Sequence, residues 1–432
     1  MKEDKMKRFF IGSSTSAHQV EGNNIHSDYW AMENMTYTDF SEKSGNAVSH
    51  YERYKEDIGL MKKAGLNAYR FSIEWARIEH EEGKFDESEI EHYRDVILCC
   101  RENGIEPVVT LHHFTSPKWL IEKGGWENPD VISYFSRYAK KVVEELGTEL
   151  GYICTINEAN MGIQVSAIAE RYKAQMMARA KQAGVEGVAQ VGMNFNTMME
   201  NMKKKAAENV TVFGTPTPQV FVSARTPEGD AIVMKAHCAA RDEIKKICPG
   251  IKVGVTLSLH DIQSTDGGEE NAKKEWNDEF GHYIPYIKND DFIGVQNYSR
   301  SVFGKDGLIP LSSDARQTQM GYELYPEALG HVIKRVYDEI GLPILVTENG
   351  IATSNDGDRC EFIDNALCGV SECMENGIPV LGYLHWSFLD NFEWQKGFSM
   401  TFGLVSVDRN TMTRTPKESL FRLGEYTNRF NS

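Results

Sequence analysis

Two segments of the sequence place a glutamate directly after a run of strand-type residues. In CTINEANM (154–161) the run leads into Asn157 and Glu158, and in LPILVTENG (342–350) it leads into Glu348. An acid at a strand end is a solvated rim charge, a salt-bridge partner or part of a site. Glycoside hydrolysis needs one carboxylic acid that protonates the leaving oxygen and one carboxylate that attacks or activates water. The two glutamates are candidates for this pair, provided that the fold brings them together.

Other strand-like runs also end on polar or aromatic side chains. Carboxylates and amides suit sugar hydroxyls, because they offer hydrogen-bond acceptors and donors side by side, and an indole can stack on the apolar face of a pyranose ring. Each residue alone is as readily explained by local backbone hydrogen bonds or by a salt bridge. As a set they indicate a carbohydrate site, and its candidate members are Gln19, Arg70, His113, Asn157, Asn297, Tyr298, Trp386, Glu393 and Trp394.

The motifs of other chemistries do not stand out. The chain has no glycine-rich phosphate loop and no clear Ser-His-Asp pattern. His112 and His113 are neighbours in a strand-like run, so they point to opposite faces and cannot share one metal ion. The histidine pair therefore does not indicate a metal site.

Eight short apolar runs must position these side chains. Most are continuously hydrophobic and do not alternate, which is typical of strands buried on both faces in a parallel sheet covered by helices. The runs span 8–17, 67–75, 106–113, 151–158, 251–258, 291–298, 342–350 and 379–387.

Helical patterns lie between the apolar runs. The first ends at Gly65, which suits a left-handed cap, and the second opens with Asp86 and Glu89 in the spacing of a capping box. The repeat of strand, helix and glycine continues without a break in composition. It predicts a single (β/α)₈ TIM barrel over residues 1–432. The expected helices lie within 51–65, 86–104, 128–147, 227–250, 326–341 and 361–377.

The interval between the fourth strand and the helix near residue 227 is abnormally long. Loops of this length hold structure of their own, so we expect an enlarged, helix-prone insertion over 159–226. Its methionines either pack amphipathic helices on the barrel or form an adaptable apolar wall beside the site. They are seven of the seventeen in the chain, Met161, Met176, Met177, Met193, Met198, Met199 and Met202.

The net charge limits the classes of binding partner, and the cysteine spacing indicates the cellular compartment. The formal net charge is −16, and an acidic surface disfavours nucleic acid and anionic membranes as partners. The eight cysteines show no regular spacing, as in a reduced protein. The first residues lack the apolar core of a signal peptide, so we expect a cytoplasmic protein.

These residues together resemble family 1 glycoside hydrolases of the β-glucosidase type. The resemblance covers nearly the whole chain and is weakest over 160–226. The NE and TENG segments, in this order on the fourth and seventh strands, are specific to it. The matching segments are TSAHQVEG, HYERYKEDIGLMKKAGLNAYRFSIEWARI, TLHHFTSPKWL, GGWENP, TINEAN, GVQNY, GYELYPEAL, VTENGIA and LHWSFLDNFEWQKGFSMTFGLVSVD.

The resemblance implies a retaining mechanism for the hydrolysis of small-molecule β-glycosides. Glu348 would be the nucleophile that forms a glycosyl-enzyme, and Glu158 would be the general acid and base. The two carboxyl groups would lie roughly 5–5.5 Å apart. No metal and no organic cofactor is required by this mechanism.

The same resemblance assigns roles to the residues around the two glutamates. Asn157 would bind the 2-hydroxyl of the sugar, and Arg70, Asn297 and Tyr298 would surround Glu348. The positive charge of Arg70 would keep that carboxyl ionised.

The remaining candidates would hold the non-reducing sugar. Gln19, His113 and Glu393 would bind its outer hydroxyls, together with Trp394. Trp386 would form the stacking floor beneath the ring.

Three alternatives remain open from the sequence. A 6-phospho-β-glycosidase is disfavoured because Glu393 would repel a phosphate, although Lys396 is nearby. A non-catalytic sugar-binding barrel would be expected to have lost one of the two acids. Transglycosylation uses the same residues as hydrolysis and differs only in the acceptor.

The chain departs from the family pattern near the site. The family usually has Pro where Ala159 follows the acid, Tyr where His18 stands, and Trp-Asp where Phe114 and Thr115 stand. These changes leave the proposed catalytic atoms in place. Together with the methionine-rich segment, they lead us to hypothesise a partly apolar aglycone.

Overall fold

The barrel is built from parallel strands that follow one another around a ring. A computed structural model describes residues 8–182 and 195–432 of the chain. Its main sheet has the strand order β5-β4-β3-β2-β1-β12-β11-β8-β6. The strands are β1 (Phe10–Ser14), β2 (Ala68–Ser72), β3 (Glu106–His112), β4 (Tyr152–Ile156), β5 (Lys252–Gly254), β6 (Thr256–Ser258), β8 (Ile293–Gln296), β11 (Ile344–Asn349) and β12 (Val380–Trp386).

The sheet closes because its two ends are halves of one strand. Only Val255 separates β5 from β6; β5 pairs with β4 and β6 pairs with β8, both in parallel. Eight strand positions therefore form a closed ring, and each of the eight apolar runs contributes one of them. The predicted (β/α)₈ barrel is confirmed.

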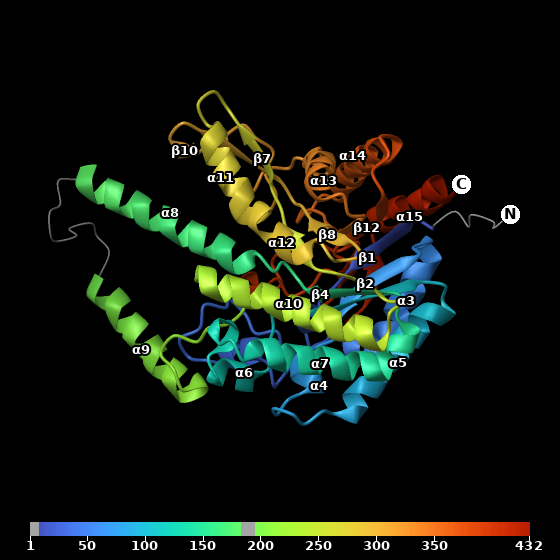
Figure 1. The fold of residues 1–432 in the computed structure, drawn as a ribbon, viewed down its shortest axis with the longest axis horizontal. Helices are drawn as coiled ribbons and strands as arrows, with labels where there is room; N and C mark the ends of the chain where they lie inside the picture. Colours follow the sequence, from blue (N-terminus) through green and yellow to red (C-terminus); the bar gives the residue numbers. More distant parts are fainter. Residues whose placement is uncertain (1–7, 183–194) are drawn as a thin grey trace.

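Helices cover the outside of the barrel, as Figure 1 shows. The long ones are α3 (His50–Ala64), α5 (Glu87–Glu102), α7 (Val131–Leu146), α10 (Pro227–Ile247), α11 (Glu269–Glu279), α13 (Ala328–Ile340), α14 (Asp356–Glu375) and α15 (Glu418–Asn431). Short helices, 3-10 turns and small strands lie in the loops. They are α1 (Ala17–Val20), α2 (Asp28–Glu33), α4 (Trp75–Ile78), α6 (Lys118–Glu122), α12 (Ile284–Ile287), η1 (Gly125–Glu127), η2 (Gly147–Glu149), η3 (Gly281–Tyr283), η4 (Trp394–Lys396), β7 (Asp261–Ser264), β9 (Arg300–Gly304), β10 (Gly307–Leu308), β13 (Val405–Val407) and β14 (Arg414–Pro416).

The helix boundaries follow the signals read from the sequence. Gly65 adopts a φ of 86° after α3, where glycine tolerates the left-handed conformation. The Asp86 side chain accepts hydrogen bonds from the N–H groups of Ser88 and Glu89 at the start of α5. One boundary differs, because α14 begins at Asp356, before the expected residue 361. Its N-cap is Asn355, whose side chain accepts from the Gly357 N–H.

The segment after β4 forms two long helices. They are α8 (Met161–Gln182) and α9 (Phe195–Phe213), and Figure 1 shows both at the end of the barrel opposite the termini. Of the seven methionines, Met193 lies outside the described residues, as do the side chains of Met176, Met177, Met198 and Met199. Met161 packs against the core, and Met202 is exposed.

The barrel interior has an apolar floor below a polar layer. A buried cluster takes its residues from the strands or, for Phe292, from the position just before β8, and its members are Phe10, Ala68, Val108, Cys154, Phe292, Leu345 and Leu384. Two residues further along β2 and β3 stand Arg70 and Thr110, which point to the same side because side chains alternate along a strand. The floor therefore excludes water from below the polar groups that follow.

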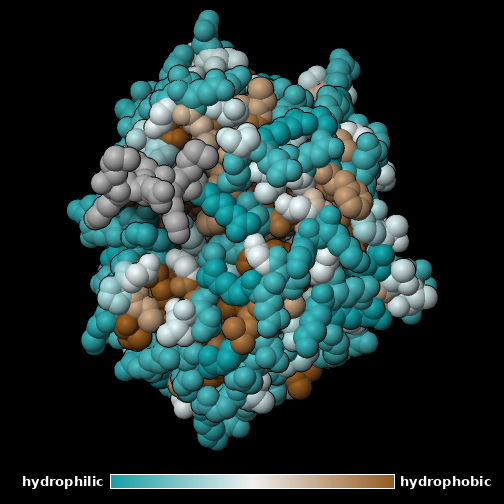
Figure 2. Space-filling model, turned by 90° about the vertical axis from the view of Figure 1, so that its right-hand side faces the viewer, coloured by the Kyte–Doolittle hydropathy of each residue, from teal (hydrophilic) through white to brown (hydrophobic). Residues whose placement is uncertain are grey.

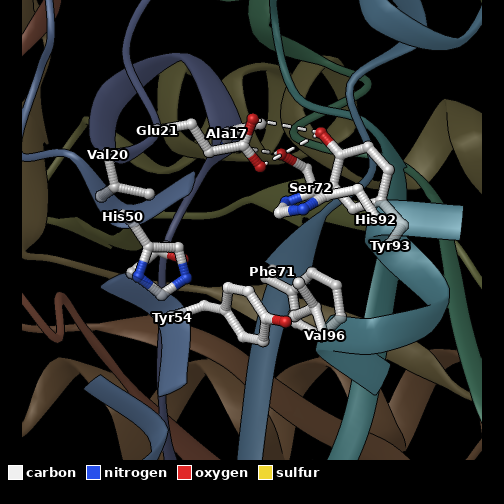
Figure 3. Close-up of a pocket in the computed structure, with 11 residues that line it drawn as sticks. Ala17, Val20, Glu21, His50, Tyr54, Phe71, Ser72, His92, Tyr93 and Val96 are labelled. Atoms are coloured by element: carbon white, nitrogen blue, oxygen red, sulfur yellow. Dashed lines mark hydrogen bonds between the residues drawn. The ribbon is translucent and has the colours of Figure 1, made fainter. Parts of the chain in front are cut away.

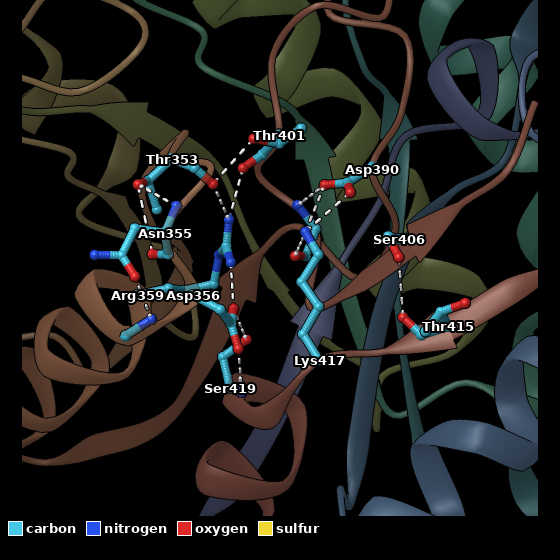
Figure 4. Close-up of polar contacts among 12 residues, drawn as sticks. Thr353, Asn355, Asp356, Arg359, Asp390, Thr401, Ser406, Thr415, Lys417 and Ser419 are labelled. Atoms are coloured by element: carbon cyan, nitrogen blue, oxygen red, sulfur yellow. Dashed lines mark hydrogen bonds and ion pairs between the residues drawn. The ribbon is translucent and has the colours of Figure 1, made fainter.

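Buried polar contacts tie the loops after β11 and β12 to α14 and α15 (Figure 4). Arg359 is 1% exposed and donates to Asp356 and to the carbonyl oxygens of Thr353 and Thr401. Lys417 donates to the Asp390 carboxylate at 3.0 Å. The loop between β12 and the hairpin formed by β13 and β14 is therefore fixed by contacts with Arg359 and with Lys417.

The face turned to the viewer in Figure 2 is mainly hydrophilic, with small separate hydrophobic areas. Among the described residues, the structure contains no helix that is long and apolar enough to cross a membrane.

The buried position of Arg359 predicts a large effect on stability. We expect Arg359→Ala to lower the free energy of unfolding by about 2–3 kcal/mol, because it removes a buried side chain and its three hydrogen bonds to partly buried acceptors. Arg316 is the matched control, since its side chain is 53% exposed while it pairs with Asp358 and Glu361. Arg316→Ala should cost less than about 1 kcal/mol. Urea unfolding of the two variants measures the difference, and equal midpoints would contradict the role given to Arg359.

Candidate active site

A pocket of about 560 Å³ opens at the carboxyl ends of the barrel strands. Both candidate glutamates line it, although Glu158 is only 6% exposed and Glu348 only 3%. Eight of the residues predicted from the sequence reach its surface, namely His113, Asn157, Glu158, Tyr298, Glu348, Trp386, Glu393 and Trp394. The other three, Gln19, Arg70 and Asn297, lie buried behind them.

Glu348 is held on both of its carboxylate oxygens. Arg70 Nη1 donates to Oε1 at 2.6 Å, and the Tyr298 hydroxyl donates to Oε2 at 2.6 Å. Burial raises the pKa of Glu348 above its ordinary value, and Arg70 and Tyr298 offset only part of this rise. Both partners favour the ionised form, because they donate to it.

Glu158 has the opposite electrostatic setting. Burial raises its pKa well above the ordinary value, the negative charge of Glu348 raises it further, and Arg70 opposes both. Two neighbouring carboxyl groups in a dry site do not both ionise readily. The proton of the pair therefore belongs on Glu158, while Glu348 carries the charge.

Arg70 links Glu348 to Asn157. It is fully buried, and its Nη2 donates to Asn157 Oδ1 at 2.5 Å, while its Nε donates to Thr110 Oγ1 at 2.9 Å. Arginine has no acceptor, so the oxygen of the Asn157 amide must face it. The Asn157 nitrogen then faces His113 Nε2 at 3.2 Å.

The contact with Asn157 also determines the tautomer of His113. Because the Asn157 nitrogen donates, His113 Nε2 accepts and the ring proton lies on Nδ1. Burial lowers the pKa of His113 well below its ordinary value, with Arg70 adding to the effect. The neutral ring therefore keeps an N–H at Nδ1, which is buried and has no partner among the residues that the structure describes.

Gln19 orients Glu393 from behind the pocket. Its Nε2 donates to the Phe392 carbonyl at 2.8 Å and to Glu393 Oε2 at 3.1 Å, and its Oε1 accepts from Ser16 Oγ at 2.7 Å. Burial is the main reason that the pKa of Glu393 rises to about 8, and the charge of Glu348 adds to it. Glu393 is thus a hydrogen-bonding group of the pocket wall whose protonation changes near neutral pH.

Aromatic rings form the remainder of this half of the pocket. The rings of His113 and Trp386 are stacked with centroids 5.6 Å apart. The ring of Trp394 stacks on that of His18, with centroids 5.9 Å apart. The backbone of Trp394 has a φ of 48°, which is unusual for a residue other than glycine. These rings offer flat apolar surfaces beside the polar groups.

Asn297 contacts Glu348 through its backbone and not through its side chain. Its N–H donates to the carbonyl oxygen of Glu348 at 3.2 Å, whereas its side-chain amide donates to the carbonyls of Leu259 and Ser299. Asn297 therefore supports the strand end that carries Glu348, and no hydrogen bond joins its side chain to the carboxylate.

The sequence reasoning did not find three polar residues close to the site. Gln296 Nε2 donates to Asn157 Oδ1 at 2.7 Å, Thr256 Oγ1 accepts from the Glu158 N–H at 2.9 Å, and Ser258 lines the pocket. They lie within β6 and β8, inside runs that read as apolar. The alternation of Thr256 and Ser258 along one strand face was the available signal.

The other half of the pocket is mainly apolar. Met161, Val165 and Ile168 of α8 line it at helical spacing. Gln164 lies between them, and its side-chain nitrogen already donates to the Ser258 carbonyl at 2.8 Å. Val222 also lines the pocket, whereas Phe114 lies beside His113 and Trp394, and Met320 packs with Trp386.

Glu21, which follows β1, lies outside this pocket. It lines a separate cavity of about 10 Å³ (Figure 3), which offers room for roughly one water molecule. Its carboxylate accepts from the Tyr93 hydroxyl at 3.1 Å and from Arg77 Nε at 2.9 Å. Burial raises the pKa of Glu21 to about 7. Its contacts are those of a buried structural carboxyl.

Comparison with known proteins agrees with the fold and with the family that the motifs resemble. The model of Glycosyl hydrolase family 1 matches residues 1–428. β-Glucosidase A of Thermotoga maritima is 28% identical over 442 residues, which cover 95% of each chain. A crystal structure of a β-glycosidase matches with a TM-score of 0.86 at 41% identity over 98% of this chain and 97% of the other. An apo β-glucosidase matches with a TM-score of 0.85 at 38% identity over 98% of both. The resemblance seen in the motifs is confirmed, and this chain, an enzyme whose family acts on small-molecule glycosides, belongs to glycosyl hydrolase family 1.

Proposed function

We propose that this enzyme is a retaining β-glycosidase that releases non-reducing terminal β-D-glucose. One observation carries the proposal: two buried carboxyl groups share the pocket, and their surroundings differ. Arg70 and Tyr298 hold Glu348 as a carboxylate, whereas burial and the charge of Glu348 keep a proton on Glu158. A nucleophile and a proton donor are the two groups that a retaining glycosidase needs.

The first step forms a covalent intermediate. A carboxylate oxygen of Glu348 attacks the anomeric carbon while the bond from this carbon to the aglycone oxygen breaks. Glu158 gives its proton to that oxygen, so the aglycone leaves as a neutral alcohol. The products are an ester between the sugar and Glu348 and a carboxylate on Glu158.

The second step restores the enzyme. Glu158 takes a proton from water as the water oxygen attacks the anomeric carbon, and the ester bond to Glu348 breaks. Two inversions give net retention of the β-configuration. Glu158 again carries the proton and Glu348 the charge. If a sugar hydroxyl replaces water, the same step gives transglycosylation.

The polar half of the pocket suits the glucose ring. The free N–H at His113 Nδ1 can donate to a sugar hydroxyl, and the Glu393 carboxyl, oriented by Gln19, can bind others. The Asn157 amide lies beside Glu348, where the 2-hydroxyl of a bound sugar would be. Trp386 and Trp394 provide the stacking surfaces for the ring.

A free 6-hydroxyl fits this site better than a 6-phosphate. In the part of the chain described here, the hydrogen-bond partners of Glu393 include no cation, and the ionised form of Glu393 would repel a phosphate dianion. The relatives reported above are named β-glucosidases and a β-glycosidase, which supports an unphosphorylated glucoside as substrate.

The apolar half of the pocket suits an apolar aglycone. Met161, Val165 and Ile168 line the pocket from α8, which begins three residues after Glu158, and we place the leaving group against them. The amide of Gln164 between them is already bonded to the backbone, so this helix face offers a leaving group mainly apolar contact. We therefore propose glucosides of flat or hydrophobic alcohols as preferred substrates. We also propose a cytoplasmic location, because eight unpaired cysteines suit a reducing compartment.

The nucleophile assignment predicts chemical rescue. Glu348→Gly should lose hydrolysis of nitrophenyl β-glucoside by more than about 10³-fold, since the covalent step is removed. Added azide or formate should restore turnover, because a small anion fits the space of the lost side chain and attacks the same carbon. Full activity of the variant without added anion would disprove the assignment. Product analysis by NMR checks that azide gives the α-glucosyl azide.

The hydrogen bond from Tyr298 predicts a shift of the pH profile. The Tyr298 hydroxyl lowers the pKa of Glu348, so Tyr298→Phe should raise it. Glu348 acts as a carboxylate, hence the acid limb of kcat/KM should move to higher pH, by about one unit for a bond to a charged group. Tyr383→Phe is the control, because it removes a buried hydroxyl that bonds to Asn349 outside the pocket. An acid limb that stays in place would contradict the contact.

The apolar residues of α8 predict that Val165→Ser weakens the binding of aryl glucosides selectively. We expect KM for a naphthyl β-glucoside to rise about 10-fold, since one lost apolar contact in a pocket changes discrimination by roughly this much. KM for methyl β-glucoside should stay within about twofold. Val210→Ser on α9 is the control, because Val210 is exposed. Wild-type activity on cellobiose equal to that on every aryl glucoside would contradict the proposal.

A further inference from the structure

The acid candidate occupies an unusual backbone conformation. Glu158 has a φ of 44°, in the left-handed region that residues with a side chain seldom adopt. The direction of its side chain depends on this conformation, because rotating the backbone would swing the carboxyl away from the pocket. Something in the surrounding structure must hold the backbone in place.

Thr256 contacts the backbone on both sides of the Glu158 side chain. Its Oγ1 accepts from the Glu158 N–H at 2.9 Å, and its carbonyl oxygen accepts from the Ala159 N–H at 3.0 Å. Thr256, Glu158 and Ala159 are all buried, so water does not compete for these bonds. The second bond exists because residue 159 is not a proline and has an N–H to donate.

The hydroxyl of Thr256 is itself fixed in orientation. It has one proton, which can reach Gln296 Oε1 or Asn157 Oδ1, each at 3.3 Å. Asn157 Oδ1 already accepts from Arg70 and from Gln296 Nε2, so Gln296 Oε1 is the better acceptor. The lone pairs of the hydroxyl oxygen are then turned to the Glu158 N–H.

Contacts with Ser258 hold Asn160, which lies two residues after Glu158. Asn160 and Ser258 exchange two hydrogen bonds, from the Ser258 N–H to Asn160 Oδ1 at 3.0 Å and from Asn160 Nδ2 to the Ser258 carbonyl at 2.7 Å. They anchor the turn before α8, but neither reaches the N–H of Glu158. The Glu158 carbonyl accepts from the Met161 N–H at 2.9 Å, and a hydrogen bond with the Ser258 side chain lowers the pKa of the Glu158 carboxyl. The Thr256 hydroxyl is the side chain that binds the Glu158 N–H.

We infer that Thr256 is a positioning residue for proton transfer by Glu158. The inference rests on the proposed function, in which Glu158 protonates the aglycone and later deprotonates water. Thr256 does not touch the sugar site in this arrangement, since it is fully buried and does not line the pocket. Its loss should therefore impair the two steps that need Glu158 and leave the attack by Glu348 intact.

Thr256→Val tests this with two substrates. The exchange keeps the shape and removes the hydroxyl. Expulsion of dinitrophenolate needs no proton, so kcat/KM for 2,4-dinitrophenyl β-glucoside should stay within about threefold of the wild type. Expulsion of an alkoxide needs the proton, so kcat/KM for methyl β-glucoside should fall about 10- to 100-fold, as for a displaced catalytic group.

A second measurement follows the release of the sugar. With 2,4-dinitrophenyl β-glucoside, kcat of Thr256→Val should fall together with KM, because water is then deprotonated slowly and the intermediate accumulates. Azide needs no general base, so it should restore kcat and yield β-glucosyl azide. A residue that only stabilised the fold would not make kcat respond to azide.

Three further variants make the outcome decisive. Thr256→Ser keeps the hydroxyl and should behave like the wild type, and Thr155→Val removes another buried strand hydroxyl, bonded to His237, without changing the substrate ratio. Glu158→Ala should show the same selective loss to a larger degree. If Thr256→Val does not fold, Thr256→Ala takes its place beside Thr256→Ser, because both lack the methyl group.

The outcomes separate the inference from the proposed function. Equal losses on both substrates, or no loss on methyl β-glucoside, would overturn the role of Thr256 while Glu158→Ala still shows the selective loss. If Glu158→Ala also lost activity equally on both substrates, the proposed role of Glu158 would be wrong.

Discussion

The buried guanidinium of Arg70 is the interaction on which the rest of the site depends. A cation fully removed from water is tolerated only when it is paired and hydrogen-bonded. Arg70 achieves this through Glu348, Asn157 and Thr110. Each of these partners comes from a different strand, so the closed barrel brings the acceptors together and Arg70 keeps them in one arrangement.

The orientation of neighbouring groups follows from the fact that Arg70 only donates. The Asn157 oxygen must face Arg70, so its nitrogen faces His113, and the proton of the imidazole moves to the nitrogen that has no partner. On the other side, Glu348 is held as an anion, which in turn makes ionisation of Glu158 more costly. The Arg70 cation thus determines the orientation of the Asn157 amide and the tautomer of His113. It also determines which of the two glutamates is ionised.

The sequence predicts the barrel and most of the site because both depend on local signals. Apolar runs ending on polar residues indicated the strands, and Asp86 and Gly65 marked helix ends where the structure has them. All the predicted site residues lie at the pocket or directly behind it. The start of α14 was placed too late, since the cap at Asn355 precedes the apolar pattern.

Other features could not be read in this way because they depend on contacts between distant strands. Gln296 and Thr256 lie inside apolar runs, and the pairing of β4 with β5 and of β6 with β8 brings them to Asn157 and Glu158. The resemblance implied that Asn297 lies around Glu348, but its side chain bonds to the backbone carbonyls of Leu259 and Ser299. The contacts of polar residues within a strand depend on which strands lie next to it.

The location of the apolar wall on α8 has a consequence for how this enzyme could diversify. The groups that hold the sugar and break the bond are fixed to the barrel by a shared network, so a change in one disturbs several others. Met161, Val165 and Ile168 project from a helix outside the ring of strands. Substitutions there can alter which alcohol is released while the chemistry stays intact. Leaving-group preference is thus a trait that selection or engineering can vary independently of catalytic power.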